Sequence, residues 1–150
     1  KDLSRFLSDQ FQKVNKKCPL DISEEISMSV EQHPYYAQKL SFFVYEVSGA
    51  NVKREDIREG FGRLFDSEKP VFESILQGLA PKQIALLRAL AKEPSASLFS
   101  LGYLKRRDLS SSGSVQGALK RLTALDLIER AAGGAWQVVD PIFSLWLKGD

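Results

Sequence analysis

The sequence predicts a mainly α-helical protein that carries one short β-hairpin near its C-terminus. Apolar residues recur at the spacing of a helix through most of the 150 residues. Proline and glycine fall at the borders of these segments, where they begin or end a helix. The pattern changes over residues 127–139, where two short apolar runs flank a pair of glycines. We therefore expect helices before and after a single hairpin.

The most informative segment is a predicted helix over residues 112–126. Its apolar stripe consists of Val115, Ala118, Leu119, Leu122 and Leu125. Its opposite face is polar and basic, and consists of Ser114, Gln116, Lys120, Arg121 and Thr123. A hydroxyl in the run 110–112, which is three serines, can accept a hydrogen bond from the amides of the first turn. Two predicted strands, 127–130 and 135–139, follow around the turn that contains Gly133 and Gly134.

Two further helices are predicted upstream of this segment. Pro81 opens the first, over residues 81–92. The second covers residues 98–107, with Leu98, Leu101 and Leu104 facing inward. The order of helix, turn, helix and β-hairpin is that of a winged helix-turn-helix domain, in which the later helix can enter the major groove of DNA.

The N-terminal half is predicted to be helical throughout. The expected helices cover residues 2–14, 21–30, 34–47, 53–65 and 71–76. Asp21 and Glu24 have the spacing of a capping box at the start of the second helix. Pro70 separates the last two, because a proline disfavours helical geometry in the residue before it. Since residues 77–80 join the halves, we expect a helical domain over residues 1–78 and a winged-helix domain over residues 79–150.

The net charge of +2 is divided unevenly along the chain. Residues 1–80 carry 11 Lys and Arg against 13 Asp and Glu, whereas residues 81–150 carry 10 against 6. The basic excess therefore falls in the half that contains the predicted hairpin, and it favours nucleic-acid binding only weakly. No apolar run approaches the ~20 residues that span a bilayer. The first residue is not Met, so we expect a fragment of a longer protein. The single cysteine, Cys18, excludes an internal disulfide, and we expect a cytoplasmic protein.

Four segments carry a resemblance to a known family. EQHPYYAQKLSFFVYE, with His33 and Pro34, resembles the helical lid of the archaeal-type ATPases, an AAA+-like branch of the STAND class of P-loop NTPases. The other three are similar to the winged helix of that family and its closing signature: GLAPKQIALLRALAKE, SSGSVQGALKRLTALDLIER and VVDPIFSLWLKG. The resemblance implies that His33 and Pro34 lie next to a nucleotide. Gln32 stands where the family usually has glycine.

The chain lacks the phosphate-binding loop of such an enzyme. No G-x-x-x-x-G-K-[S/T] sequence occurs, and the amides and lysine of that loop hold the phosphates. The resemblance implies that ATP and magnesium bind a core domain N-terminal to Lys1. We therefore expect no catalytic activity from this chain alone. A thiol–imidazole pair of Cys18 and His33 would lack an orienting partner, so we expect no catalytic site there either.

Two hypotheses remain for the winged helix. In the first, the helix at 112–126 lies in the major groove of duplex DNA, and side chains contact either bases or phosphates. The candidate DNA-binding residues are Ser112, Ser114, Gln116, Lys120, Arg121, Lys105, Arg106 and Arg107. In the second, the winged helix is a protein-interaction or autoinhibitory domain. It packs on the ATPase core or on another protein, and it relays the nucleotide state of the ATPase core. Gly117 lies on the outer face, where glycine costs about 1 kcal/mol of helix stability relative to alanine. This cost indicates that a partner, either DNA or a protein, approaches the helix closely there.

Two tryptophans are expected to be structural. Trp136 lies in the second predicted strand, and Trp146 follows Phe143 at helical spacing. We expect them to attach the wing and the last helix to the body of the domain.

Overall fold

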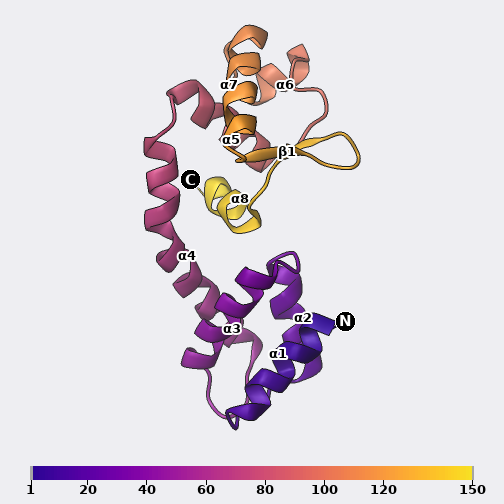
Figure 1. Ribbon diagram of the computed structural model, residues 1–150, viewed down its shortest axis with the longest axis vertical. Coiled ribbons are helices and arrows are strands. Elements are labelled where there is room, and N and C mark those ends of the chain that lie inside the picture. The colour runs from indigo at the N-terminus through magenta and orange to yellow at the C-terminus, as the bar shows by residue number, and fades with distance from the viewer. Residues whose placement is uncertain (1, 150) are drawn as a thin grey trace. The chain divides into compact units, whose positions relative to one another are not determined.

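Helices account for most of the computed structural model, which describes residues 2–149 (Figure 1). In chain order the described elements are α1 (Asp2–Lys13), α2 (Leu20–Ser29), α3 (Pro34–Val47), α4 (Arg54–Gln77), α5 (Pro81–Lys92), α6 (Leu101–Arg106), α7 (Ser112–Ala124), β1 (Ile128–Arg130), β2 (Trp136–Val138) and α8 (Pro141–Lys148). The prediction of a mainly helical chain with one hairpin is confirmed. Contacts divide the chain into two compact units, Lys1–Pro70 and Val71–Asp150.

In the N-terminal unit, α1, α2 and α3 pack against one another (Figure 1). The buried apolar side chains of this unit include Leu7, Phe11, Ile22, Ile26, Val30, Tyr36, Leu40, Val44, Ile57 and Leu64. Gly60 of α4 lies against α3, because a Cβ built there would stand 2.7 Å from Cγ2 of Val44. Two residues of the predicted α1 stripe, Phe6 and Val14, are exposed, so this stripe is only partly buried.

The long helix α4 corrects the prediction of two helices separated by Pro70. Residues 54–77 form one continuous helix with Pro70 inside it. Proline removes one backbone hydrogen bond and crowds the preceding turn, which normally ends or bends a helix. Here Leu64 and Glu68 are buried before the proline and Phe72 after it, while Pro70 itself is exposed. Packing on both sides therefore holds helical geometry across the proline.

Two predicted helix starts are also wrong. α2 begins at Leu20 with Pro19 as its N-cap and has no side-chain cap, so Asp21 does not act as the N-cap of a capping box. α6 begins at Leu101 instead of residue 98, because the hydroxyl of Ser100 accepts from the amide of Tyr103 and caps the helix there. As a result Leu101 points outward and is 75% exposed, although it was expected to face inward.

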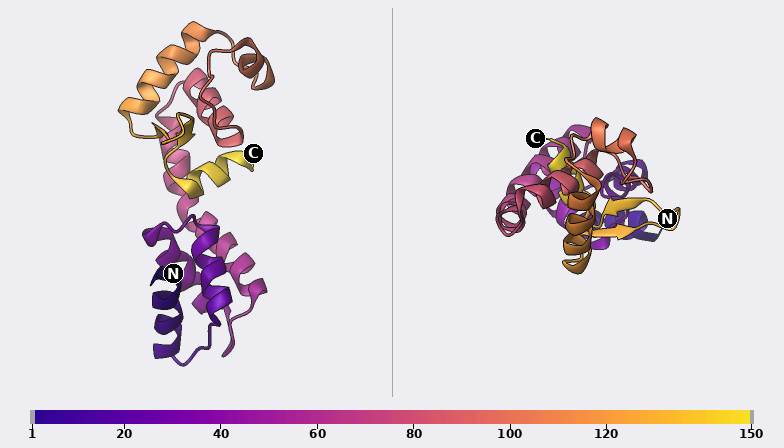
Figure 2. Two further views of the ribbon diagram at one scale, coloured as in Figure 1. Left: turned by 90° about the vertical axis from the view of Figure 1, so that its right-hand side faces the viewer. Right: turned by 90° about the horizontal axis from the view of Figure 1, so that it is seen from above.

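The C-terminal unit is built around α5, which packs against α7, α8 and β2. Its buried side chains include Leu86, Leu87, Leu90, Leu98, Tyr103, Leu104, Val115, Leu122, Ile128, Ile142, Phe143 and Leu147. The antiparallel strands pair Ile128 with Val138 and Arg130 with Trp136, and Figure 2 shows them side by side. Gly134, at φ +89°, makes the tight turn of this wing. Trp136 also exchanges two backbone hydrogen bonds with Ser95.

The last helix, α8, is fixed at its start and along one face. The carboxylate of Asp140 accepts hydrogen bonds from the amides of Ile142 and Phe143, each at 2.9 Å. The ring of Phe143 stacks on that of Phe72, with centroids 4.9 Å apart. Trp146 is half-buried and contacts both phenyl rings. Among the residues described, none of the helices combines the length and apolar character needed to cross a membrane.

Candidate nucleic-acid interface

Helix α7 presents the polar face that its sequence predicts. Val115, Ala118 and Leu122 are buried, so the opposite face points away from the core. Of the candidate residues on α7, Ser112, Gln116, Lys120 and Arg121 are exposed and Ser114 is half-buried. Ser111 is the N-cap, and its hydroxyl accepts from the amide of Ser114. Leu125 is exposed and does not extend the buried stripe.

The hydroxyl of Ser114 is already engaged within the protein. Nζ of Lys82, in the first turn of α5, donates to Oγ of Ser114 at 3.1 Å. Oγ of Ser111 lies at the same distance from that oxygen. Ser114 is therefore less available to a base than the sequence suggests. Lys82 was not among the predicted site residues, because a contact across 32 positions leaves no local pattern.

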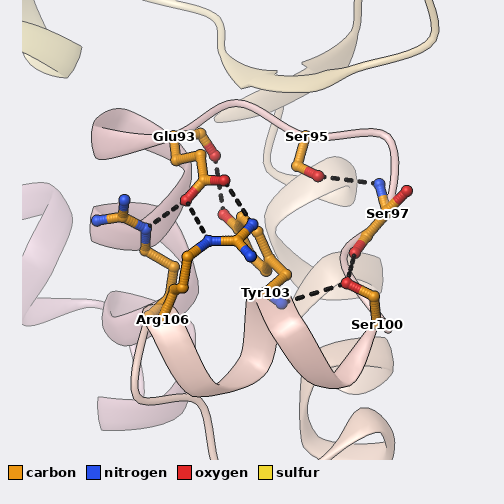
Figure 3. Close-up of polar contacts among 7 residues, drawn as sticks. Glu93, Ser95, Ser97, Ser100, Tyr103 and Arg106 are labelled. Carbon is orange, nitrogen blue, oxygen red and sulfur yellow. Dashed lines mark hydrogen bonds and ion pairs between the residues drawn. The ribbon is translucent and has the colours of Figure 1, made fainter.

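Two of the three basic residues at the end of α6 are held by an acidic side chain. Nη2 of Arg106 donates to Oε1 of Glu93 at 2.7 Å, and Nε of Arg107 donates to Oε2 at 2.8 Å. These hydrogen bonds from Arg106 and Arg107 hold the pKa of Glu93 below its ordinary value. Tyr103 donates to the backbone oxygen of Glu93, and Figure 3 shows its side chain and that of Arg106 directed toward Glu93. Lys105 stays exposed and, within the described residues, outside any ion pair.

A groove lies between α7 and the wing. We call it the α7 groove, and its lining is Gly113, Gln116, Gly117, Leu119, Lys120, Thr123 and Trp136. The indole of Trp136 is half-buried, and the guanidinium carbon of Arg130 lies 5.8 Å from its ring centroid. Nε of Arg130 also donates to the backbone oxygen of Gly134. Trp136 thus lines the groove in addition to pairing with Ser95. The alternation of residues along the strand did not predict that its indole would line a groove.

The predicted lid residues begin α3. His33 is the N-cap and Pro34 the first helical residue, and both are exposed. The His33 ring lies 4.9 Å from that of Tyr36. Gln32 adopts φ +57°, which glycine reaches without strain, and this explains why glycine suits this position. His33 and Pro34 therefore lie on the surface of the N-terminal unit, and their contact with a nucleotide stays a prediction.

The N-terminal unit contains a groove and a buried cysteine. An apolar groove between α1 and α3 is lined by Phe6, Leu7, Gln10, Phe11, Val14, Gln38, Ser41, Phe42 and Tyr45. Cys18 is buried, and burial together with the charge of Asp21 raises the pKa of its thiol to about 11, so the thiol stays protonated at neutral pH. Within residues 2–149, no three His, Cys, Asp or Glu side chains lie together in a way that could hold a metal ion.

Comparisons with known proteins agree with this architecture. The fold matches that of a Walker-type ATPase of Pyrococcus abyssi with a TM-score of 0.76 and 19% sequence identity. The match covers 97% of this chain but 41% of the other, so the chain spans less than half the length of that protein. No curated protein sequence matches the chain. A family model described as a probable winged helix domain matches residues 70–149, more than half of the sequence. The chain therefore belongs to this family of probable winged helix domains.

Proposed function

We propose that this chain is the regulatory, DNA-binding end of a cytoplasmic archaeal-type ATPase and has no catalytic activity of its own. ATP and magnesium would bind a separate nucleotide-binding core, and α7 would lie in the major groove of duplex DNA. One observation carries the proposal. Lys120 and Arg121 stand exposed on the outer face of α7, and within the part of the chain that the structure describes no acidic side chain pairs with them.

The cations around α7 contribute unequally in this proposal. Lys105, Lys120 and Arg121 are exposed and would contact phosphates directly. Arg106 and Arg107 share the carboxylate of Glu93, so their charge is partly compensated inside the protein. Lys82 and Arg130 lie next to the same face, through their contacts with Ser114 and Trp136. Ser112 and Gln116 are the exposed polar side chains of α7 that would face the bases.

The salt dependence of duplex binding tests this function. Three phosphate contacts predict that log K falls against log salt with a slope of roughly −3, because each neutralised phosphate contributes about −0.9. Arg121→Gln should reduce that slope by about one unit. Arg5→Gln is the matched control, since Arg5 is an exposed arginine of α1 in the N-terminal unit. If no complex forms with any duplex at low salt, the proposal is wrong.

A second candidate function, protein interaction, has its own observation. Phe6, Val14 and Phe42 line the groove between α1 and α3 and are 46%, 48% and 55% exposed. Exposed apolar side chains in a groove between helices suit an amphipathic helix of a protein partner, such as the ATPase core. Isothermal titration of this chain with the purified core tests it. Phe42→Asp should abolish the heat of binding, whereas Val71→Asp, at an exposed position of α4, should leave it unchanged.

A further inference from the structure

The outer face of α7 carries glycine where a base-reading helix needs side chains. Gly113 and Gly117 share this face with Gln116 and Lys120. A Cβ built at either glycine meets nothing within 4 Å, in contrast to Gly60, where it would stand 2.7 Å from Val44. Packing of this chain therefore does not require glycine at 113 or 117. Both glycines belong to the lining of the α7 groove and leave the helix backbone there without a side chain.

Two hydroxyl side chains in or beside this groove are used internally. Oγ1 of Thr123 donates to the backbone oxygen of Leu119 at 2.7 Å. Ser114 is engaged by Lys82 and Ser111. Gln116 is then the one residue in the lining of the α7 groove whose amide could read adenine. Ser112 and Lys120 are the other candidate residues of α7 that are exposed and able to donate to a base, so few groups of this helix are available to distinguish base sequences.

The charged groups of the same groove are suited to the DNA backbone. Lys120 lies in the lining, and Arg121 follows it on the exposed surface. Arg130 lies outside the lining, but it is held next to Trp136, over the indole and against the oxygen of Gly134. Cations in and beside a groove suit a chain of phosphates, which carries the same charge in every sequence.

We propose that the α7 groove binds the sugar–phosphate backbone of duplex DNA and does not discriminate among base sequences. This inference rests on the DNA binding proposed above and specifies what is recognised. The open space at Gly113 and Gly117 lets one strand approach the helix closely. Lys120 of the lining and Arg130 next to Trp136 neutralise its phosphates, and the indole of Trp136 packs against its sugars.

Fluorescence anisotropy with the full chain and short labelled duplexes of unrelated sequence tests the inference. The dissociation constants should agree within about threefold across sequences, whereas each mismatched base pair weakens the binding of a base-reading protein by roughly five- to 150-fold. Gln116→Ala should leave the relative affinities of the duplexes unchanged. A Cβ at Gly117 meets nothing within 4 Å, so Gly117→Leu adds a side chain to the groove and should weaken binding to every duplex by about tenfold or more through lost phosphate contacts. Gly62→Leu is the control, because Gly62 is equally open but lies in the N-terminal unit.

The outcomes separate this inference from the proposed function. A preference of more than about tenfold for one sequence, removed by Gln116→Ala, would overturn backbone recognition and leave DNA binding intact. Unchanged affinity of Gly117→Leu would also overturn it, because the groove would then be outside the interface. If no duplex binds at low salt, the proposed DNA binding itself fails, and the inference fails with it.

Discussion

Replacing Phe143 with alanine should weaken the attachment of α8 to the C-terminal unit. Phe143 is 2% exposed, and its ring stacks on Phe72 at 4.9 Å and on Trp146 at 6.1 Å. Truncation of a buried phenylalanine costs about 3–5 kcal/mol, because both the transfer free energy and the packing around the cavity are lost. This is a large part of the ~5–15 kcal/mol by which a domain is stable. We expect a loss in the upper half of the range of truncation costs, since two aromatic contacts disappear together.

Tryptophan fluorescence during urea unfolding measures this loss. Both tryptophans of the chain, Trp136 and Trp146, lie in the C-terminal unit, so the signal reports on that unit alone. Trp146→Ala should cost less than Phe143→Ala, because Trp146 is only half-buried. Phe42→Ala is the control, since Phe42 is 55% exposed in the N-terminal unit and should not move this transition. An unchanged urea midpoint for Phe143→Ala would refute the assignment of α8 to the core.

Three further predictions concern single residues. Gln32→Gly should stabilise the N-terminal unit by about 1 kcal/mol, because the left-handed conformation strains residues other than glycine. Gln38→Gly, in the middle of α3, should destabilise the unit by a similar amount. Urea unfolding followed by circular dichroism measures both. The thiol of Cys18 should react slowly with iodoacetamide at pH 8 until urea unfolds the chain, because its pKa is about 11. Glu93→Gln should make the melting temperature fall less steeply as the pH is lowered. The pKa of Glu93 is lowered in the folded state, so its carboxylate stabilises the fold fully above the ordinary pKa. That stabilisation disappears as the pH falls through the lower folded pKa.

Each of these has an outcome that contradicts it. A lower unfolding free energy for Gln32→Gly would show that the side chain contributes more than the strain removes. Rapid alkylation of native Cys18 would mean that the thiol is reached without unfolding. Identical melting profiles of Glu93→Gln and the parent chain between neutral pH and pH ~3 would show that the two arginine contacts contribute no stability, a known outcome for exposed ion pairs.

The winged-helix order could be predicted because each of its signals is local. The apolar stripe that contains Val115 and Leu122 lies within one helix, and the serine cap and the glycine turn each involve neighbouring residues. Local patterns of this kind do not depend on which surfaces meet. The structure accordingly has α7 over Ser112–Ala124, close to the predicted 112–126, and places both strands within one residue of their predicted bounds.

The candidate site was less predictable, because its chemistry depends on contacts between distant residues. A run of three cations at the end of a helix indicates phosphate binding, yet Glu93 lies 13 and 14 positions before two of them and compensates their charge. Likewise, the groove exists because the wing folds back beside α7, so that Trp136 and Gly117 line the same groove. Residue types alone show neither arrangement.

The continuous helix α4 shows why a strong local rule can give the wrong structure. Pro70 disfavours a helix through its own ring and its missing amide, at a cost of about 3 kcal/mol in a helix interior. Burial of Leu64 before the proline and of Phe72 after it offsets that cost, since a fully buried large apolar side chain contributes about 1.5–3 kcal/mol. Pro70 is exposed, and so is Asp66, whose carbonyl would accept from the amide that proline lacks. Water can bind that carbonyl instead. The sum over the helix therefore favours continuity, although residues 69–70 considered alone favour a break.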